Sequence, residues 1–351
     1  MQFGPCPIAD AEGAILAHAV RTPRGVFRKG RVLAPADIDA LREADIQDVR
    51  VARLEEGDVG EDEAAARIAK ACAGEGVRIG AAFTGRANLH SELHGVAVID
   101  AARIAALNAI DESITVATLA PYAAVGIRQM LATIKIIPFA APRAAVEEAE
   151  RILQGNPAIR IAAFRPRRAT LISTATPGTR PALLDKNRSA LDTRLHALGS
   201  MIALERRVAH QADAVATALT EVNSTGTDPI LVFGASAITD RRDVIPVAIE
   251  QAGGSVEHFG MPVDPGNLLL LGRLGDAIVI GLPGCARSPK LNGFDFVLQR
   301  VLANLPVRRD DIAAMGVGGL LTEIHTRPQP RDQQPIKGPR APKIGAIVLA
   351  A

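Results

Sequence analysis

The sequence contains no tryptophan, a single tyrosine and nine phenylalanines, so aromatic residues make up only 3% of its 351 residues. Proteins that bind single-stranded nucleic acid stack the bases on aromatic side chains, and this chain has few of them. The charge is nearly balanced, with 40 basic and 38 acidic residues. Because a nucleic-acid-binding domain needs a basic surface, we expect no nucleic-acid partner.

Cysteine is scarce too, with Cys6, Cys72 and Cys285 as its three occurrences. Their odd number and wide spacing fit neither a disulfide framework nor a zinc ribbon, which favours a reducing compartment. The chain also lacks the basic start and apolar run of a signal peptide. No apolar segment approaches the roughly 20 residues of a membrane helix. We therefore expect a cytoplasmic protein with no membrane partner.

The length favours more than one domain, and the patterns change along the chain. Residues 1–165 mix amphipathic stretches typical of helices, at 36–46 and 61–74, with strand-like stretches at 47–54 and 114–120. This mixture predicts an α+β N-terminal region.

Residues 166–326 follow a different rhythm, in which apolar strands alternate with polar loops and amphipathic helices. Strands that alternate with helices favour a parallel sheet covered by helices on both faces. We therefore predict an α/β domain here. The strand-like stretches are 169–175, 228–235 and 276–284, and the helix-like stretches are 187–199, 206–222, 241–254 and 293–305.

The last part of the chain has a composition of its own. Residues 327–343, "RPQPRDQQPIKGPRAPK", contain five prolines and five basic residues, which predicts an extended linker. Residues 344–351, "IGAIVLAA", then read as an apolar strand. A linker that leads into one strand suggests the start of a further domain.

Polar loops follow three strands of the predicted α/β domain, at 174–199, 234–246 and 281–293. The carboxyl ends of strands in open α/β sheets line the crevice where ligands bind. A phosphate suits this crevice, because Gly234 permits close backbone approach, Ser236 offers a hydroxyl, and Gly284 stands just before a helix whose N-terminus favours anions. Asp240 and Asp243 would repel a bare phosphate. A hard cation such as Mg²⁺ between them would resolve the conflict.

Five segments follow one another in the chain: "STATPG", "DKNRSALDTRLHALG", "GASAITDRRDVIP", "VDPGN" and "GLPGCA". In this order they resemble the molybdopterin-binding domain shared by molybdopterin adenylyltransferases and molybdopterin molybdotransferases. The whole chain resembles the N-terminal part of bacterial proteins that fuse this domain to a molybdenum cofactor nucleotidyltransferase, and "IGAIVLAA" is similar to the first strand of that transferase.

The resemblance implies a role for each matching residue. Asp243 would be the essential catalytic carboxylate, and Asp240 with Asp243 would hold Mg²⁺. The ligand would be molybdopterin or the molybdenum cofactor, and related domains associate, which implies a homo-oligomer. The residues implied to bind the ligand are Asp185, Asn187, Gly234, Ser236, Gly266, Gly284 and Cys285.

Several positions depart from the family pattern. Ala175, Thr176 and Pro177 stand where an acidic pair is expected, Asn267 replaces a lysine, and Cys285 with Ala286 replaces Asn-Pro. A domain that binds and presents molybdopterin tolerates these losses better than one that catalyses. We therefore expect it to present the pterin to a fused nucleotidyltransferase, which would bring a nucleotide as a second partner. The alternatives are that the domain itself adenylylates molybdopterin or inserts molybdate, or that it is an interaction scaffold.

Some of these residues also have a structural explanation. Asp243 could stabilise the first turn of the helix that follows it, where an acidic side chain is ordinarily favourable. Cys285 could be a small loop residue. His90 and His94 are four apart and could face one metal if that stretch were helical, although a third ligand is missing.

Overall fold

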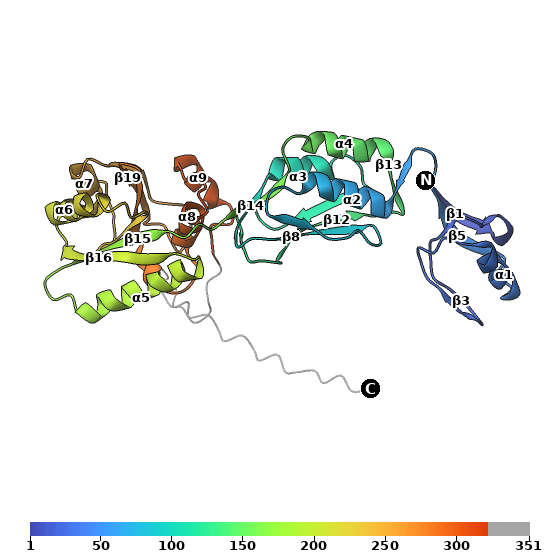
Figure 1. Cartoon of the computed structure of the whole chain (residues 1–351), viewed down its shortest axis with the longest axis horizontal. Coiled ribbons are helices and arrows are strands. Elements are labelled where there is room, and N and C mark those ends of the chain that lie inside the picture. Colours follow the sequence, from blue (N-terminus) through green and yellow to red (C-terminus); the bar gives the residue numbers. More distant parts are fainter. Residues whose placement is uncertain (322–351) are drawn as a thin grey trace, which may run out of the picture.

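The computed structural model describes residues 1–321, and the predicted linker at 327–343 and strand at 344–351 lie outside this part. The amino-terminal unit packs a short antiparallel sheet, in the order β1-β5-β2, against one helix (Figure 1). Its elements are β1 (Gln2–Pro7), η1 (Ile8–Asp10), β2 (Ile15–Leu16), β3 (Val20–Thr22), β4 (Gly25–Phe27), α1 (Pro35–Glu43) and β5 (Asp48–Arg53).

Helix α1 begins with Pro35 in its first turn, where the ring fits the backbone. The buried Asp37 carboxylate accepts hydrogen bonds from Arg31 Nε and Nη2, at 2.8 and 2.7 Å, and from Ala34 N at 3.1 Å. The Arg31 guanidinium holds the pKa of this carboxyl below its usual value, although burial opposes the shift.

Replacing Asp37 with asparagine is therefore expected to destabilise the amino-terminal unit by about 1–2 kcal/mol, the range for lost caps and charged hydrogen bonds. The folded-state pKa is lowered, so this stabilisation is present above the unfolded value near 3.8 and is lost as pH falls below it. Urea unfolding at pH 7 and at pH 3 checks this. A difference between parent and variant that is as large at pH 3 would contradict it.

A second unit follows, in which three helices lie over two small antiparallel sheets (Figure 1). The sheet orders are β10-β12-β8-β7 and β11-β9-β14, and β13 pairs with β6. The elements are β6 (Asp58–Gly60), α2 (Glu61–Cys72), β7 (Val77–Ile79), β8 (Arg86–Ser91), β9 (Gly95–Ile99), α3 (Ala101–Asn108), β10 (Ile114–Thr118), β11 (Ala124–Val125), β12 (Met130–Ile136), β13 (Ala140–Pro142), α4 (Arg143–Leu153) and β14 (Ile159–Ala163).

Residues 1–165 thus mix helices and strands, but they contain two main cores rather than one. Leu16, Leu41 and Val51 belong to the first core, whereas Ile68 and Ile134 belong to the second. The domain boundaries expected from the sequence remain a prediction.

The carboxy-terminal unit is built on a six-stranded sheet in the order β16-β15-β17-β20-β19-β18. Its elements are β15 (Arg168–Ala175), α5 (Pro181–Ala197), β16 (Met201–Ala209), α6 (Ala212–Asn223), β17 (Ile230–Phe233), α7 (Val244–Gln251), β18 (Ser255–Phe259), β19 (Leu270–Leu274), β20 (Ala277–Leu282), η2 (Gly284–Arg287), α8 (Gly293–Leu302), α9 (Arg309–Ala313) and η3 (Ala314–Gly316).

Side chains of the central strand β17 alternate between the two faces of this sheet. Leu231 and Phe233 join a core with residues of α5 and α8, whereas Ile230 and Val232 join a core with residues of α6 and α7. A strand buried on both faces is expected to be apolar throughout, as "ILVF" is. The expected mixed α/β character is confirmed.

Two details predicted for this unit were wrong, the direction of two strands and the start of one helix. Strands β16, β15, β17 and β20 are parallel, but β19 and β18 join antiparallel at one edge, so the sheet is mixed. The helix expected over 206–222 starts only at Ala212, because the preceding residues complete β16. As an edge strand β16 carries exposed and half-exposed charges, which conceal the apolar pattern of a strand.

Backbone and side-chain contacts join the second and third units. Arg165 N donates to Leu302 O at 2.8 Å, and the Arg300 guanidinium lies 4.0 Å from the centre of the Tyr122 ring. A small apolar cluster supports this junction with the residues Val96, Ala162 and Ala303. No helix in residues 1–321 is long and apolar enough to span a membrane.

Candidate functional site

Four parallel strands of the carboxy-terminal sheet, β16, β15, β17 and β20, are direct neighbours. Their carboxyl ends therefore meet at one edge, where ligands of open α/β sheets bind. The loops that follow them carry most of the residues implied to bind the ligand. We use the name strand-end site for the residues Thr174, His210, Gly234–Ser236 and Gly284–Arg287.

Hydrogen bonds connect the carboxyl end of β15 with the loops that follow β16 and β17. His210 Nε2 lies 2.9 Å from Ser236 Oγ, and His210 Nδ1 lies 2.8 Å from Thr174 Oγ1. Thr174 Oγ1 also accepts a hydrogen bond from Ala235 N at 2.7 Å. Thr174 is buried and Ser236 is exposed, so this chain of contacts leads from the sheet to the surface.

The loop after β20 is tied to the same edge by Arg287. Its Nη2 donates to Gly234 O at 2.9 Å, and its guanidinium lies 5.8 Å from the centre of the Phe233 ring. Arg287 Nε and Ser173 Oγ are buried, and neither has a hydrogen-bond partner among the described residues. Ser173 aligns with Phe233 on the adjacent strand. Arg287 Nε of the site and the Oγ of Ser173, the residue before Thr174, are thus two unpaired polar groups near the Phe233 ring.

Gly234 occupies a crowded position in this edge. A Cβ atom there would overlap the Ser236 carbonyl oxygen and come within 3.1 Å of Ile245 Cδ1. Glycine is therefore required by the packing of the loop itself. Gly284 differs, because a Cβ atom there would meet nothing within 4 Å.

The two predicted residues of α5 have different environments. Asp185 is exposed, and its carboxylate receives a 2.6 Å hydrogen bond from Arg207 Nη2 of β16. Arg207 also pairs with Glu205 at 2.7 Å. Asn187 is buried at 4% exposure, on the helix face that packs toward the sheet. Only Asp185 is open to a ligand from solvent.

Asp243 caps helix α7 in the structure. Its Oδ1 accepts from Val244 N at 2.8 Å, and its Oδ2 accepts from Thr239 N at 3.1 Å. Asp240 pairs with Arg242 at 2.8 Å, and these hydrogen bonds hold the pKa of the Asp240 carboxyl below its usual value. Both carboxylates are therefore engaged in organising their own loop.

The remaining predicted residues lie in the later loops. Gly266 is buried, and a Cβ atom there would come within 2.7 Å of Gly293 N at the start of α8. Packing against α8 thus accounts for this glycine without a ligand. Cys285 is half-buried in η2, next to Gly284.

The described residues contain no group of three or more histidine, cysteine, aspartate or glutamate side chains that could hold a metal ion. The pair His90 and His94 does not share a helix face, because Arg86–Ser91 form strand β8. The His94 ring instead packs edge-on against Phe164, with 4.9 Å between ring centres.

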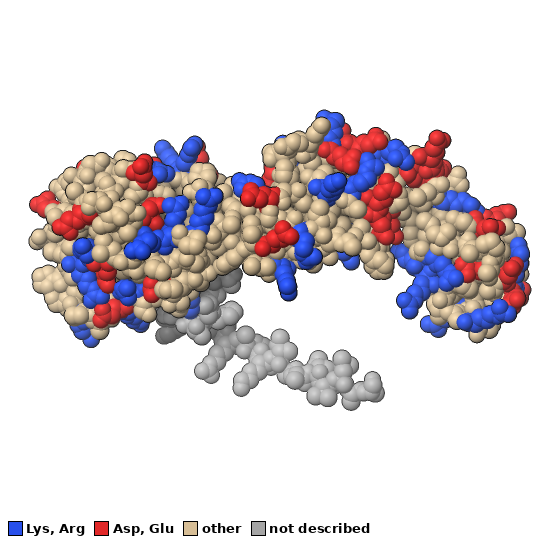
Figure 2. Space-filling view, viewed as in Figure 1, with Lys and Arg blue, Asp and Glu red and all other residues tan. Residues whose placement is uncertain are grey.

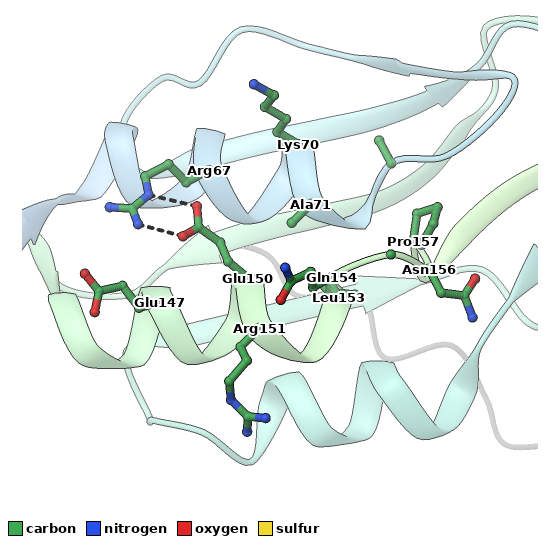
Figure 3. A pocket seen from close by; sticks show the side chains of 12 residues that line it. Arg67, Lys70, Ala71, Glu147, Glu150, Arg151, Leu153, Gln154, Asn156 and Pro157 are labelled. Carbon is green, nitrogen blue, oxygen red and sulfur yellow. Dashed lines mark hydrogen bonds and ion pairs between the residues drawn. The ribbon is translucent and has the colours of Figure 1, made fainter.

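An open groove of about 710 Å³ lies between α2 and α4 in the second unit, and no residue of the strand-end site lines it. Figure 3 shows the Arg67 guanidinium and the Glu150 carboxylate paired across it, with hydrogen bonds of 3.0 and 2.7 Å. Arg151 is paired with Glu148, and the other charged residues of the lining, Lys70 and Glu147, have opposite signs. The charges around the groove therefore nearly balance. On the face shown in Figure 2, basic and acidic side chains lie among one another.

Thr174, His210 and Arg287 are the residues of the site to which the sequence analysis gave no role. His210 lay inside the stretch predicted as a helix, and Thr174 belonged to the matching segment "STATPG" without a role of its own. For Thr174 an available signal was its position at the end of an apolar stretch, where a polar side chain faces the ligand edge.

Comparisons with known proteins give little further information. Residues 5–53 match the family described as "Domain of unknown function (DUF8806)". No curated protein matches the chain. A molybdopterin biosynthesis MoeA protein from Pyrococcus horikosii is 14% identical over 86% of this chain and 75% of its own, with a TM-score of 0.31. A molybdenum cofactor biosynthesis protein from Pyrococcus furiosus is 12% identical over 87% of this chain and 64% of its own, with a TM-score of 0.26.

These two TM-scores are too low for the structural likeness to carry an argument about this chain. The function proposed below therefore rests on the chain's own residues and on the motifs they form.

Proposed function

We propose that the carboxy-terminal unit binds molybdopterin or the molybdenum cofactor at the strand-end site and presents it to a fused nucleotidyltransferase domain. The supporting observation is the set of hydrogen bonds that joins the end of β15 to the loops after β16, β17 and β20 at one edge. It is accompanied by five motifs in the order of the molybdopterin-binding family. Ser236 and Arg287 offer polar groups there for an anionic ligand, and His210 is hydrogen-bonded to Ser236.

Asp240 and Asp243 are the residues that would hold Mg²⁺ in this unit. Mg²⁺ prefers several carboxylate, phosphate or water oxygens in an octahedral arrangement. Both oxygens of Asp243 already accept backbone hydrogen bonds, and Asp240 is paired with Arg242. As they stand, these residues fit loop stabilisation better than a prepared magnesium site, and no step of the function is assigned to Mg²⁺.

Binding and presentation are favoured over catalysis by the domain itself. Thr176 and Pro177 provide no carboxylate where the family pattern has an acidic pair, and Asn267 provides no positive charge. Without these groups the site retains a shaped, polar edge but lacks charges expected for adenylyl transfer or molybdate insertion. Oligomerisation and a cytoplasmic location belong to the proposal as well.

Ser236→Ala tests the site directly. We expect the affinity for a phosphorylated pterin to fall by about 1–3 kcal/mol, the scale of one hydrogen bond to a charged group. Titration calorimetry of parent and variant measures the change, and the melting temperature serves as the folding control. Equal affinities would remove Ser236 from the binding site.

Gly284→Ala separates ligand contact from folding. Because the added methyl group meets no protein atom within 4 Å, we expect stability to change by no more than about 0.5 kcal/mol. If the ligand approaches this backbone closely, its affinity should fall about tenfold. The same titration and a thermal melt measure both quantities, and an unchanged affinity would place the ligand away from the loop after β20.

A further inference from the structure

The histidine in the strand-end site has a defined set of hydrogen-bond partners. Ala235 N can only donate, so Thr174 Oγ1 must accept at 2.7 Å. Thr174 is 2% exposed, and among residues 1–321 the remaining partner of its hydroxyl is His210 Nδ1 at 2.8 Å. A buried hydroxyl proton left without an acceptor is costly, so Thr174 donates its proton to Nδ1.

This assignment fixes the proton of the imidazole. A neutral imidazole carries one proton, and with Nδ1 accepting, that proton is on Nε2. Nε2 then donates to Ser236 Oγ at 2.9 Å. Ser236 therefore accepts from His210 and keeps its own hydroxyl proton for a further partner. Since Ser236 is exposed, that partner is a group outside the protein.

We infer that Thr174 and His210 are positioning residues that hold Ser236 as a hydrogen-bond donor toward an anionic oxygen of the ligand. This inference rests on the proposed function for the identity of the site. The same hydrogen bonds exclude Ser236 as a nucleophile. A nucleophilic serine needs an imidazole nitrogen that accepts its proton, and here that nitrogen is the donor. We call the hydrogen-bonded chain Thr174–His210–Ser236 the relay. Its free Ser236 hydroxyl proton suits the recognition of an anion such as a phosphate group.

Two variants at Thr174 test the relay on the full chain. Thr174→Val removes the hydroxyl with little change in shape, whereas Thr174→Ser keeps it. We expect the affinity for inorganic phosphate, followed by phosphorus NMR, to fall about tenfold in the valine variant. The serine variant should stay within about twofold of the parent. When the parent binds phosphate, an equal affinity of the valine variant would overturn the relay.

The tautomer of His210 gives a second measurement that needs no ligand. Nitrogen NMR of ¹⁵N-histidine protein, with His210→Gln to assign the signal, should show a protonated Nε2 and an unprotonated Nδ1. The opposite tautomer in the parent would overturn the inference, as would labelling of Ser236 by a fluorophosphonate that His210→Gln abolishes. If the parent shows the expected tautomer but binds no phosphate, the relay stands and the proposed function fails.

Discussion

Replacing Gly234 with alanine is expected to destabilise the carboxy-terminal unit by about 3 kcal/mol, the upper part of the usual range for overpacking. The added methyl group overlaps the Ser236 carbonyl oxygen and crowds Ile245, so the loop after β17 must move. That movement displaces Ser236 from His210. We therefore expect the affinity for a phosphorylated pterin to fall by more than tenfold as well.

Chemical denaturation and ligand titration measure the two effects. Gly126→Ala is a matched control in the second unit, because a Cβ atom there meets nothing within 4 Å. It should leave both quantities unchanged. If Gly234→Ala is as stable as the parent and binds equally well, the loop is looser than the structure indicates and the strand-end site is wrongly placed.

Replacing Asp243 with alanine is expected to cost about 2 kcal/mol of stability, the upper end for the loss of a helix N-cap. The variant loses the hydrogen bonds from Val244 N and Thr239 N, which together join helix α7 to the preceding loop. Asp243→Asn keeps one acceptor oxygen, so its stability should lie between those of the parent and the alanine variant.

The same variants decide whether Asp243 holds a cation. Under the capping role, the ligand affinity of each variant falls by the same factor with Mg²⁺ and with a chelator, because the loop is loosened in both conditions. Under the role implied by the family resemblance, the loss appears only when Mg²⁺ is present. Calorimetric titrations in both conditions distinguish the roles, and a loss confined to Mg²⁺ would refute the capping explanation.

The sequence determined the local features of the carboxy-terminal unit. The apolar stretches at 169–175 and 228–235 predicted β15 and β17, because a strand buried on both faces needs apolar residues throughout. The glycine at 234 and the serine at 236 marked the loop after β17. Local composition is enough for such features, since each depends on neighbours in the chain.

Edge elements were harder to predict from the same kind of pattern. Strand β16 has buried Ile202 beside charged Glu205, Arg206 and Arg207, because one of its edges has no neighbouring strand. Its sequence therefore resembles the start of the following helix. The antiparallel strands β18 and β19 escaped prediction as well, because short apolar runs do not reveal which partner they pair with.

Only the tertiary structure decided which side chains meet. Thr174 and His210 are 36 residues apart, and His210 and Ser236 are 26 apart, yet the strand order β16-β15-β17 brings all three to one edge. Likewise, only the folded loop shows both Asp243 oxygens bonded to backbone amides. The hydrophobic pattern marks the fully buried strands, but the order of strands in the sheet depends on packing between distant segments, and that order created the relay to Ser236.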